Sequence, residues 1–310
     1  MTLEVIKAVI LGHAVADAVG VPAEFKSRRT LKKSPVTDMS GYGTYNLPKG
    51  FWSDDTSMSL ATLDSLKTGK IDFDGIMKNF SAWYNMGEYT PRGEVFDIGG
   101  GCLAAISKYD RGTPAEKCGA GDEFSNGNGS LMRIHPIALY LYGKDMPIEE
   151  KISLIRRASA LTHAHERSAL ACEIYSVLLW ELLDEPTLSS FERGLSRARE
   201  LYEDNPELKT YARIFGNIAT LSEDKIKSSG YVVDTLEAAI YCIMTTKDYK
   251  TCVLKAVNLG EDTDTVAAIA GGLAGALYGF SAIPAHWLAE LKRRDYIEEL
   301  CHAAYIAWQE

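Results

Sequence analysis

Two short acidic segments have the composition of a metal site: residues 52–56 (WSDDT) and residues 260–265 (GEDTDT). An apolar pattern of helical period follows each segment, so a single Asp, Ser or Thr in each would suffice as a helix N-cap. Each segment instead holds several carboxylates and hydroxyls, and packed carboxylates repel one another unless a cation lies among them. Oxygen ligands of this type suit Mg²⁺, Mn²⁺ or Ca²⁺. The two segments together therefore predict a metal site, with two helix caps as the alternative.

Two glycine-rich turns could hold a phosphate or a ribose. Residues 99–101 (GGG) and residues 126–130 (NGNGS) each precede an apolar segment. A glycine-rich turn at the start of a helix exposes backbone N–H groups, which suit anionic oxygens. The second turn is also compatible with a hairpin, although its flanks lack the alternation that strands show. Arg133 follows this turn, and we expect it to form a structural ion pair.

Isolated polar side chains in apolar surroundings are further candidates. Asp17 and Glu24 lie on either side of the predicted end of the first helix, where solvated cap residues are the usual interpretation. His163 and His165 are two residues apart, so they cannot share one helical face as zinc pairs do. His163 is compatible with a bond to a substrate phosphate or hydroxyl, and equally with a satisfied structural histidine.

Composition narrows the class of protein. The 310 residues carry a net charge of −9, which argues against a protein that coats nucleic acid with a basic face. The six cysteines are scattered without a CxxC pair, as is typical of reduced thiols in a cytoplasmic protein. The first residues, MTLE, lack the basic start of a signal peptide. We therefore expect a cytoplasmic protein, and we expect it to be a monomer.

Apolar periodicity predicts helices and no run of regular strands. Predicted helices cover residues 3–19, 56–68, 71–86, 147–158, a long segment ending near 183, polar segments to about 223, residues 235–245 and a segment from 266. No linker divides the chain. The sequence thus predicts one compact all-α domain of orthogonally packed helices over residues 1–310.

Residues 266–286 require a membrane check, because they contain no charged side chain over nearly spanning length. Gly271, Gly275 and Gly279 are spaced four apart, as in paired membrane helices. The segment is nevertheless rich in Gly and Ala, and Pro284 ends it. We interpret it as a central helix that is buried on all sides, with glycines that let neighbouring helices come close.

Taken together, the motifs resemble the ADP-ribosylglycohydrolase family, of the type that reactivates dinitrogenase reductase. The resemblance covers nearly the whole chain. It rests on GHAVADAVGVPAE (12–24), WSDDT (52–56), NGNGSLMR (126–133), TH (162–163), SGYVVDTLEAA (229–239) and GEDTDT (260–265). Several motifs in the right order are much more specific than any one of them. The resemblance implies an all-α fold of this family's type.

The resemblance also implies a site for two divalent cations, Mg²⁺ or Mn²⁺. The implied metal ligands are Ser53, Asp54, Asp55, Asp262, Asp264 and Thr265. The implied catalytic residues are Glu24, Asp55 and Asp264, with Glu24 in a loop beside the metals. The implied substrate-binding residues are Asp97, Gly99, Gly100, Gly101, Asn126, Gly127, Asn128, Gly129, Ser130 and His163. Two departures from the family pattern, Ala16 in place of Gly and Ser53 in place of Thr, remove no chemical group.

The implied reaction is hydrolysis at the anomeric carbon of ADP-ribose, which releases it from a modified protein side chain, with arginine expected. Such a bond breaks through an oxocarbenium-like state. A metal pair would position the ribose hydroxyls and activate water, and Glu24 would move a proton. The partner is an ADP-ribosylated protein or a related small molecule, without nucleic acid or membrane. Two alternatives are a non-hydrolytic, crystallin-like member of the same fold and a metal phosphohydrolase.

Overall fold

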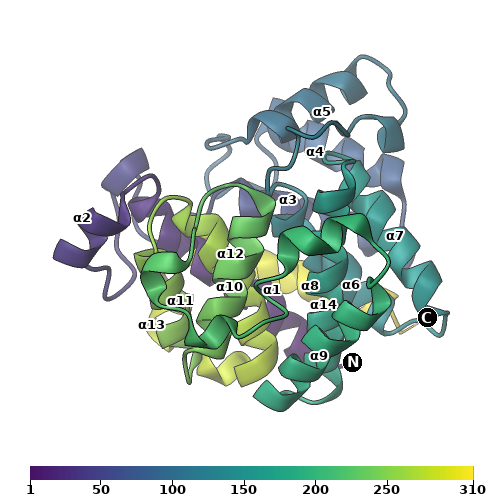
Figure 1. The fold of residues 1–310 in the computed structure, drawn as a ribbon. Coiled ribbons are helices and arrows are strands. Elements are labelled where there is room, and N and C mark those ends of the chain that lie inside the picture. Colours follow the sequence, from purple (N-terminus) through teal and green to yellow (C-terminus); the bar gives the residue numbers. More distant parts are fainter. Residues whose placement is uncertain (310) are drawn as a thin grey trace.

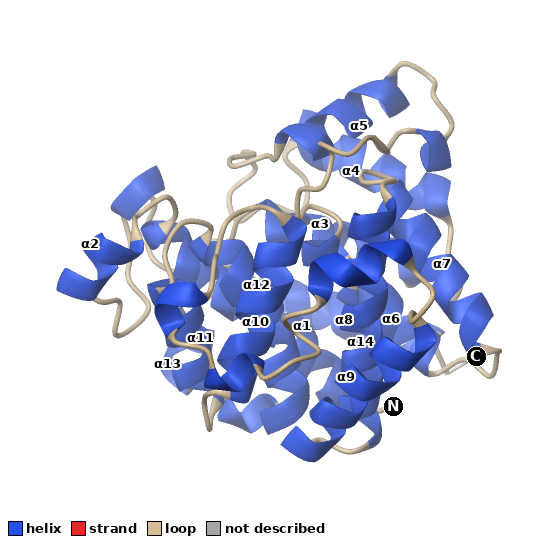
Figure 2. Cartoon of the chain, in the orientation of Figure 1, coloured by secondary structure: helices blue, strands red, loops and turns tan. Residues whose placement is uncertain are grey.

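The computed structural model describes residues 1–309, and within that range the chain forms helices and no strand (Figures 1 and 2). The α-helices are α1 Leu3–Gly20, α2 Arg28–Lys33, α3 Asp54–Leu66, α4 Phe73–Met86, α5 Gly100–Asp110, α6 His135–Tyr142, α7 Ile148–Ala160, α8 Glu166–Asp184, α9 Leu188–Leu201, α10 Val232–Met244, α11 Tyr249–Asn258, α12 Thr263–Tyr278, α13 Ala285–Glu290 and α14 Arg294–Ala307. Short 3-10 helices, such as Val21–Ala23, Leu131–Arg133 and Pro206–Tyr211, join them. The all-α fold predicted from the sequence is confirmed. The assignment of all 310 residues to one domain stays a prediction.

The pairing of α1 with α12 forms the centre of the molecule, and α12 lies near the middle of the view in Figure 1. The two helices run antiparallel, because Ala8 contacts Gly275 while Gly20 contacts Asp264. A Cβ atom on Gly275 would lie 2.0 Å from the carbonyl oxygen of Ala8, and one on Gly271 would lie 2.4 Å from the Cβ of Ala16. The glycines therefore permit a backbone approach that any side chain would block.

This pairing positions the acidic segments. The C-terminal end of α1 lies against the N-terminus of α12, where the hydroxyl of Thr263 donates a hydrogen bond of 2.8 Å to the carbonyl of Gly20. The helix α3 packs on both α1 and α12, with its acidic N-terminus at the same end. Three segments that are far apart in the sequence thus meet at one place.

The predicted helix boundaries need correction at the acidic segments. The sequence predicts helix starts after the acids, at residues 56 and 266, but α3 begins at Asp54 and α12 at Thr263. The carboxylates belong to the first turns, where they lie near free backbone N–H groups. The polar segment after α8 holds a single regular helix, α9, followed by short 3-10 turns up to residue 225.

One segment, Leu3–Ala23, is long and apolar enough to cross a membrane by length and composition alone. In the structure 89% of its window is buried inside the protein, as expected for a core helix. The helix α12, which opens the charge-free segment 266–286, is buried from Thr263 to Gly275. Both helices therefore take part in the protein core.

We expect Gly275→Ala to lower the free energy of unfolding by roughly 3 kcal/mol, because the new methyl group would overlap the backbone of α1. Gly143→Ala is the matched control. Gly143 has an ordinary φ of −75°, and the nearest atom to an added Cβ lies 3.8 Å away. Its change should stay within about 0.5 kcal/mol. Urea unfolding of both variants measures the difference, and equal stabilities would contradict the packing argument.

Candidate metal centre and substrate cavity

Asp17, in the last turn of α1, organises the N-terminus of α3. Its carboxylate accepts hydrogen bonds from the backbone N–H of Ser53 at 3.0 and 3.1 Å and from the N–H of Thr56 at 3.1 Å. The Thr56 hydroxyl donates a further bond of 2.6 Å. Asp17 is fully buried, so its interpretation as a solvated cap residue was wrong. It instead caps a different helix and faces the acidic segments.

Two clusters of carboxylates form at the meeting point of α1, α3 and α12. Oxygens of Asp17, Asp55 and Asp264 lie within 4.8 Å of one another, and so do oxygens of Glu24, Asp262 and Asp264. Asp264 belongs to both clusters. The structure therefore brings together the two acidic segments, as the sequence predicted, and adds Asp17 to them.

Hydroxyl and amide groups tie the clusters together. Asp55 accepts hydrogen bonds from the hydroxyls of Ser53 at 2.9 Å and Thr265 at 3.1 Å, so the second bond joins the two acidic segments. The side-chain amide of Asn128 donates a bond of 2.8 Å to Asp262. The remaining acid of the first segment, Asp54, lies outside both clusters.

Burial disfavours the ionised form of these acids. It raises the pKa of Asp55 and of Asp264 well above the ordinary value, and neighbouring carboxylates raise it further. Burial, partly offset by hydrogen bonds from Ser53 and Thr56, raises the pKa of Asp17 to about 7. Burial, and then the charge of Asp97, raises the pKa of Glu24 to about 9. Without a cation the clusters therefore hold protons near neutral pH.

Several oxygens of the clusters fit a hard cation. Among residues 1–309, Oε2 of Glu24, Oδ1 of Asp55 and Oδ2 of Asp264 are buried without a hydrogen-bond partner. Buried polar atoms are normally paired, so these carboxylate oxygens are available to bind a cation. Carboxylate and hydroxyl oxygens are the ligands that Mg²⁺ and Mn²⁺ prefer. The donor set thus suits a divalent metal ion.

A cavity of about 390 Å³ opens beside the clusters. Its lining residues are Glu24, Phe25, Asp54, Asp97, Ile98, Gly99, Gly100, Gly101, Cys102, Gly127, Asn128, Gly129, Met132, His163, Gly230, Asp262 and Thr265. A larger cavity, of about 750 Å³, lies between α9 and residues 208–219, away from the carboxylate clusters. The smaller one has the volume of a ligand site and holds the polar groups that could do chemistry.

A backbone reversal follows Glu24 at the cavity wall. Phe25, which directly follows Glu24, has a φ of 63°, in the left-handed region that side chains disfavour. Its N–H donates a hydrogen bond of 2.7 Å to the carbonyl of Glu261, which stabilises the reversal. The loop of Glu24 is thereby attached to the second acidic segment.

The structure separates the predicted substrate residues into two groups. The cavity wall includes Asp97, Gly99, Gly100, Gly101, Gly127, Asn128, Gly129 and His163. The side chains of Asn126 and Ser130 are directed into the protein instead. Asn126 accepts a hydrogen bond of 3.1 Å from Ser168, and Ser130 pairs with Ser159 at 2.9 Å. A direct substrate contact from these two side chains is therefore not supported, and the binding role of the others stays a prediction.

The second glycine-rich turn is a tight loop and not a hairpin. Residues 126–128 pair with residues 230–232 through an isolated bridge between Gly127 and Tyr231. The 3-10 helix Leu131–Arg133 then follows directly. Of the two interpretations of residues 126–130, the glycine-rich turn that precedes a helix is therefore correct, and the hairpin is wrong.

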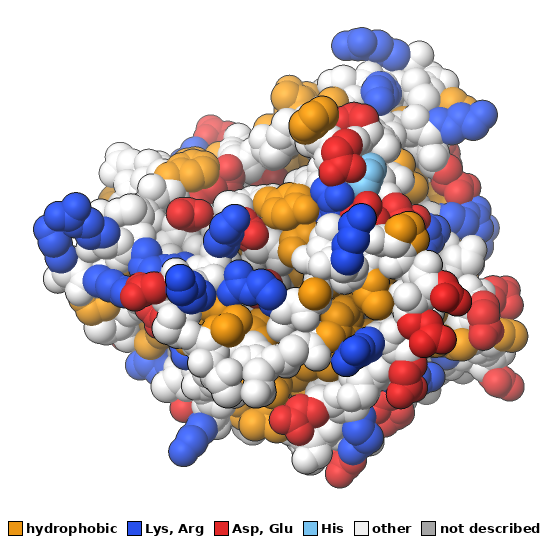
Figure 3. Space-filling view, viewed as in Figure 1, with side chains coloured by type: hydrophobic (Ala, Val, Ile, Leu, Met, Phe, Trp, Pro, Cys, Tyr) orange, Lys and Arg blue, Asp and Glu red, His pale blue; other side chains and the backbone are white. Residues whose placement is uncertain are grey.

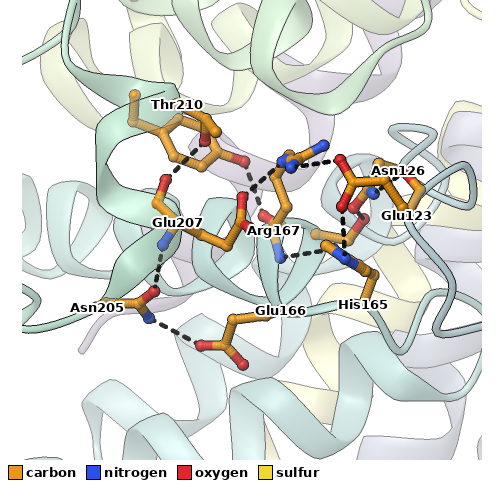
Figure 4. Close-up of polar contacts among 10 residues, drawn as sticks. Glu123, Asn126, His165, Glu166, Arg167, Asn205, Glu207 and Thr210 are labelled. Carbon is orange, nitrogen blue, oxygen red and sulfur yellow. Dashed lines mark hydrogen bonds and ion pairs between the residues drawn. The ribbon is translucent and has the colours of Figure 1, made fainter.

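A polar network behind this loop fixes its position (Figure 4). The guanidinium of Arg167 donates hydrogen bonds of 2.8 Å to Glu123 and 2.7 Å to Glu207. His165 caps α8 by accepting from the N–H of Arg167 at 3.2 Å, and it also lies 3.4 Å from Glu123. The side chains in Figure 4 thus join the segment before Asn126 to the N-terminus of α8.

Three predicted metal ligands have other observed contacts. Ser53 is the N-cap of α3, where its hydroxyl accepts from the N–H of Asp55 at 3.2 Å. Asp54 faces the cavity and accepts from the N–H of Gly99 at 3.3 Å. Thr265 lies at the cavity wall and bonds Asp55. Whether these three bind metal stays a prediction.

Arg133 is structural, but the expected ion pair was wrong. Its guanidinium is fully buried, and among residues 1–309 it has no carboxylate partner. It donates hydrogen bonds of 3.1 Å to the carbonyl of Ala158 and 2.7 Å to the hydroxyl of Thr162, and it lies 4.9 Å from the centre of the Phe80 ring. The positive charge therefore lies directly behind the cavity.

Sequence reasoning missed Asp17 as a site residue. A signal was present: between Lys7 and Glu24, Asp17 is the sole charged residue in an otherwise apolar helix. An apolar helix is normally buried, so a carboxylate on it is buried too. Because burial of an unpaired charge is costly, such a carboxylate indicates a polar partner or a ligand elsewhere in the fold.

Comparison with known proteins agrees with this arrangement. Residues 2–310 match the sequence model of the family described as ADP-ribosylglycohydrolase. An ADP-ribosylarginine hydrolase Tri1 from Pseudomonas putida (strain GB-1) is 34% identical, over 96% of this chain and 77% of the relative. An ADP-ribosyl-[dinitrogen reductase] glycohydrolase from Rhodospirillum rubrum is 33% identical, over 91% of this chain and 88% of the relative.

A solved structure described as an ADP-ribosylglycohydrolase-related protein complex superposes with a TM-score of 0.82 at 31% identity, and 98% of each chain is covered. The family match and the similar relatives, together with this fold, define a glycohydrolase that acts on ADP-ribosyl bonds. The chain belongs to the ADP-ribosylglycohydrolase family. The predicted resemblance and the predicted class of enzyme are thus confirmed.

Asp264→Asn should have opposite effects on stability without and with metal. With a chelator present, loss of one carboxylate from both clusters relieves repulsion, so the variant should melt at a higher temperature than the wild type. With excess Mg²⁺ or Mn²⁺ the order should reverse. A ligand at 100 times its Kd stabilises the native state by about 2.7 kcal/mol, and the variant should lose most of this gain.

Thermal unfolding with and without each ion measures both effects. Asp204→Asn, which alters an exposed aspartate after α9, is the control and should behave like the wild type. Equal ion-dependent stabilisation of Asp264→Asn and wild type would show that the clusters are not the metal site.

Proposed function

We propose that the protein releases ADP-ribose from arginine side chains of modified proteins, by hydrolysis at the anomeric ribose carbon with two bound divalent cations, Mg²⁺ or Mn²⁺. The observation that carries the proposal is the pair of carboxylate clusters that share Asp264 at the edge of a ligand-sized cavity. Arginine is favoured because two relatives, 34% and 31% identical to this chain, are ADP-ribosylarginine hydrolases.

Under this proposal each of the two clusters would hold one cation. Asp17, Asp55 and Asp264 would hold one, while Asp262 and Asp264 would hold the other, with Glu24 beside it. When bound, divalent cations supply positive charge that polarises hydroxyls and water. The unpaired oxygens of Asp55 and Asp264 are the atoms that support this assignment.

The protein's own groups would bind and orient the substrate. Gly100 and Gly101 open α5 directly after Gly99, and their free backbone N–H groups favour a diphosphate. The turn with Gly127 and Gly129 forms the adjoining wall and would hold the ribose. A substrate held in this way would place its anomeric carbon beside the acidic clusters, and fixed geometry of this kind lowers the barrier to reaction.

Glu24 is the residue placed to move the proton. It lies at the cavity wall, its Oε2 has no hydrogen-bond partner among residues 1–309, and its side chain is almost fully buried. A carboxyl group in such surroundings can take a proton from water or deliver one to the leaving group. We propose this as its role in the reaction.

We further propose that the protein acts as a monomer in the cytoplasm, on proteins and not on nucleic acid or membrane. The cavity and both clusters are built from one chain, so the site needs no second copy. All six cysteines are free and buried, which is compatible with a reducing compartment. Figure 3 shows basic side chains gathered at the edge formed by α2, and acidic and basic ones mixed elsewhere on this face.

The function is tested with peptides that carry ADP-ribose on arginine or on serine, each with Mg²⁺, with Mn²⁺ and with a chelator. We expect free ADP-ribose from the arginine peptide, in the presence of a cation only. Release from the serine peptide alone would change the proposed substrate from ADP-ribosylarginine to ADP-ribosylserine. Binding of ADP-ribose without any release would favour the non-hydrolytic alternative, and cleavage of the diphosphate would favour a phosphohydrolase.

Glu24→Gln should reduce kcat by about 10²- to 10⁴-fold, because an amide keeps the shape but cannot accept or deliver the proton. Affinity for ADP-ribose should change much less, since the aspartates and both glycine turns remain. Steady-state kinetics and calorimetry measure the two quantities.

Glu261→Gln is the matched control for this variant. Glu261 is an exposed acid in the neighbouring loop and does not line the cavity. Its kcat should equal that of the wild type. A normal kcat for Glu24→Gln would remove Glu24 from the proposed mechanism, whereas weaker ADP-ribose binding at normal kcat would make it a binding residue.

A further inference from the structure

Glycines surround the imidazole of His163 at the cavity wall. A Cβ atom on Gly101 would lie 2.8 Å from Nε2, and one on Gly127 would lie 3.3 Å from it. A Cβ on Gly129 would lie 2.9 Å from the adjacent ring carbon, Cε1. Any larger residue at these positions would cover the Nε2 edge of the ring. The two glycine-rich turns therefore leave this edge open to a ligand.

The opposite edge of the ring is engaged by Thr162. Nδ1 of His163 lies 3.0 Å from the Thr162 hydroxyl oxygen, and Arg133 donates to the same oxygen at 2.7 Å. A guanidinium only donates, so the Thr162 oxygen must accept from Arg133. Among residues 1–309, two acceptors then lie near the Thr162 hydroxyl hydrogen: Nδ1 of His163 and the sulfur of Cys102. Sulfur accepts only weakly, so the hydroxyl donates to Nδ1.

The imidazole is neutral in these surroundings. His163 is 4% exposed, and burial, together with the charge of Arg133, lowers its pKa to about 3. A neutral imidazole carries one N–H, and the hydrogen bond at one nitrogen decides which nitrogen bears it. The arrangement at Nδ1 therefore determines what Nε2 presents to the cavity.

The other tautomer is disfavoured at both edges of the ring. With hydrogen on Nδ1, an N–H would point toward the positive charge of Arg133, and the Thr162 hydrogen would lose its acceptor. The Nε2 lone pair would then face a cavity whose wall includes Asp54 and Asp97. With hydrogen on Nε2, both edges of the ring are matched to their neighbours.

We propose that Arg133 and Thr162 are positioning residues that hold His163 in the Nε2–H tautomer, so that Nε2 donates a hydrogen bond to an anionic diphosphate oxygen lying against the glycine-rich turns. The ligand half of this inference rests on the proposed function, because it takes the ligand to be an ADP-ribosyl group. The tautomer half rests on the protein's own contacts. A lone pair on Nε2 would repel the same oxygen.

The tautomer is measured directly in the wild-type protein without ligand. Long-range ¹H–¹⁵N spectra of protein labelled at histidine distinguish the two neutral forms, and the signal that disappears in His163→Gln assigns the ring. We expect a single Nε2–H form from pH 6 to 8. An Nδ1–H form, or a charged ring, would overturn the proposal whatever the protein binds.

Thr162→Val and Thr162→Ser form the matched pair that tests the ligand half. Valine keeps the shape but removes the hydroxyl, so Nδ1 loses its donor, and the ¹⁵N shifts should move toward a mixture of tautomers. Calorimetry with ADP-ribose should show binding about twofold to tenfold weaker, since the competent form is diluted and its orientation is less fixed. Serine keeps the hydroxyl and should restore wild-type shifts and affinity.

Unchanged shifts and affinity in Thr162→Val would overturn the positioning role. Equal weakening in the Ser and Val variants would do the same, because it would show a purely structural effect. If the wild-type protein binds no ADP-ribose, the proposed function fails and the hydrogen bond to diphosphate fails with it, while the spectra still decide the tautomer.

Discussion

Mutual repulsion of carboxylates packed into one site is the constraint on which the rest of this structure depends. Asp17, Asp55 and Asp264 come from three different helices, and their oxygens lie within 4.8 Å of one another. Such an arrangement is unfavourable unless other contacts compensate. The close antiparallel packing of α1 on α12 is a favourable contact of this kind, because the glycine-lined interface brings two apolar helices into backbone contact.

Helix ends moderate the repulsion locally. The helices α3 and α12 both begin at the clusters, so the partial positive charges of their N-termini lie beside the acids. The N–H of Gly99, at the start of α5, adds a donor to Asp54. Each such interaction contributes about 0.3–1 kcal/mol, which is small beside the cost of ionising several buried acids at short range. The helix ends thus reduce the repulsion among the acids but do not cancel it.

Much of the fold and the core of the site could be predicted from the sequence, because both depend on local patterns. Apolar periodicity gave the helices, and the clustering of Asp54, Asp55, Asp262 and Asp264 indicated a metal site. Contacts between distant segments could not be obtained in this way. Asp17 caps a helix that begins 37 residues later in the chain, so no local pattern reveals its partner.

The same limit applies to side-chain direction within a motif. Asn126 and Ser130 belong to the predicted glycine-rich turn, but their side chains are directed into the protein, where Ser168 and Ser159 supply partners from other segments. Arg133 was expected to have an acidic partner and instead contacts a carbonyl, a hydroxyl and an aromatic ring.

The antiparallel pairing of α1 with α12 has a further consequence for biosynthesis. The hydrogen bond between Thr263 and Gly20 joins residues that are 243 positions apart. At ribosomal rates of about 5–20 residues per second, roughly 12–50 s pass between the synthesis of Gly20 in α1 and that of Thr263 in α12. During that time α1 lacks the surface against which it packs, and the carboxylate clusters can form only after Asp264 has been synthesised.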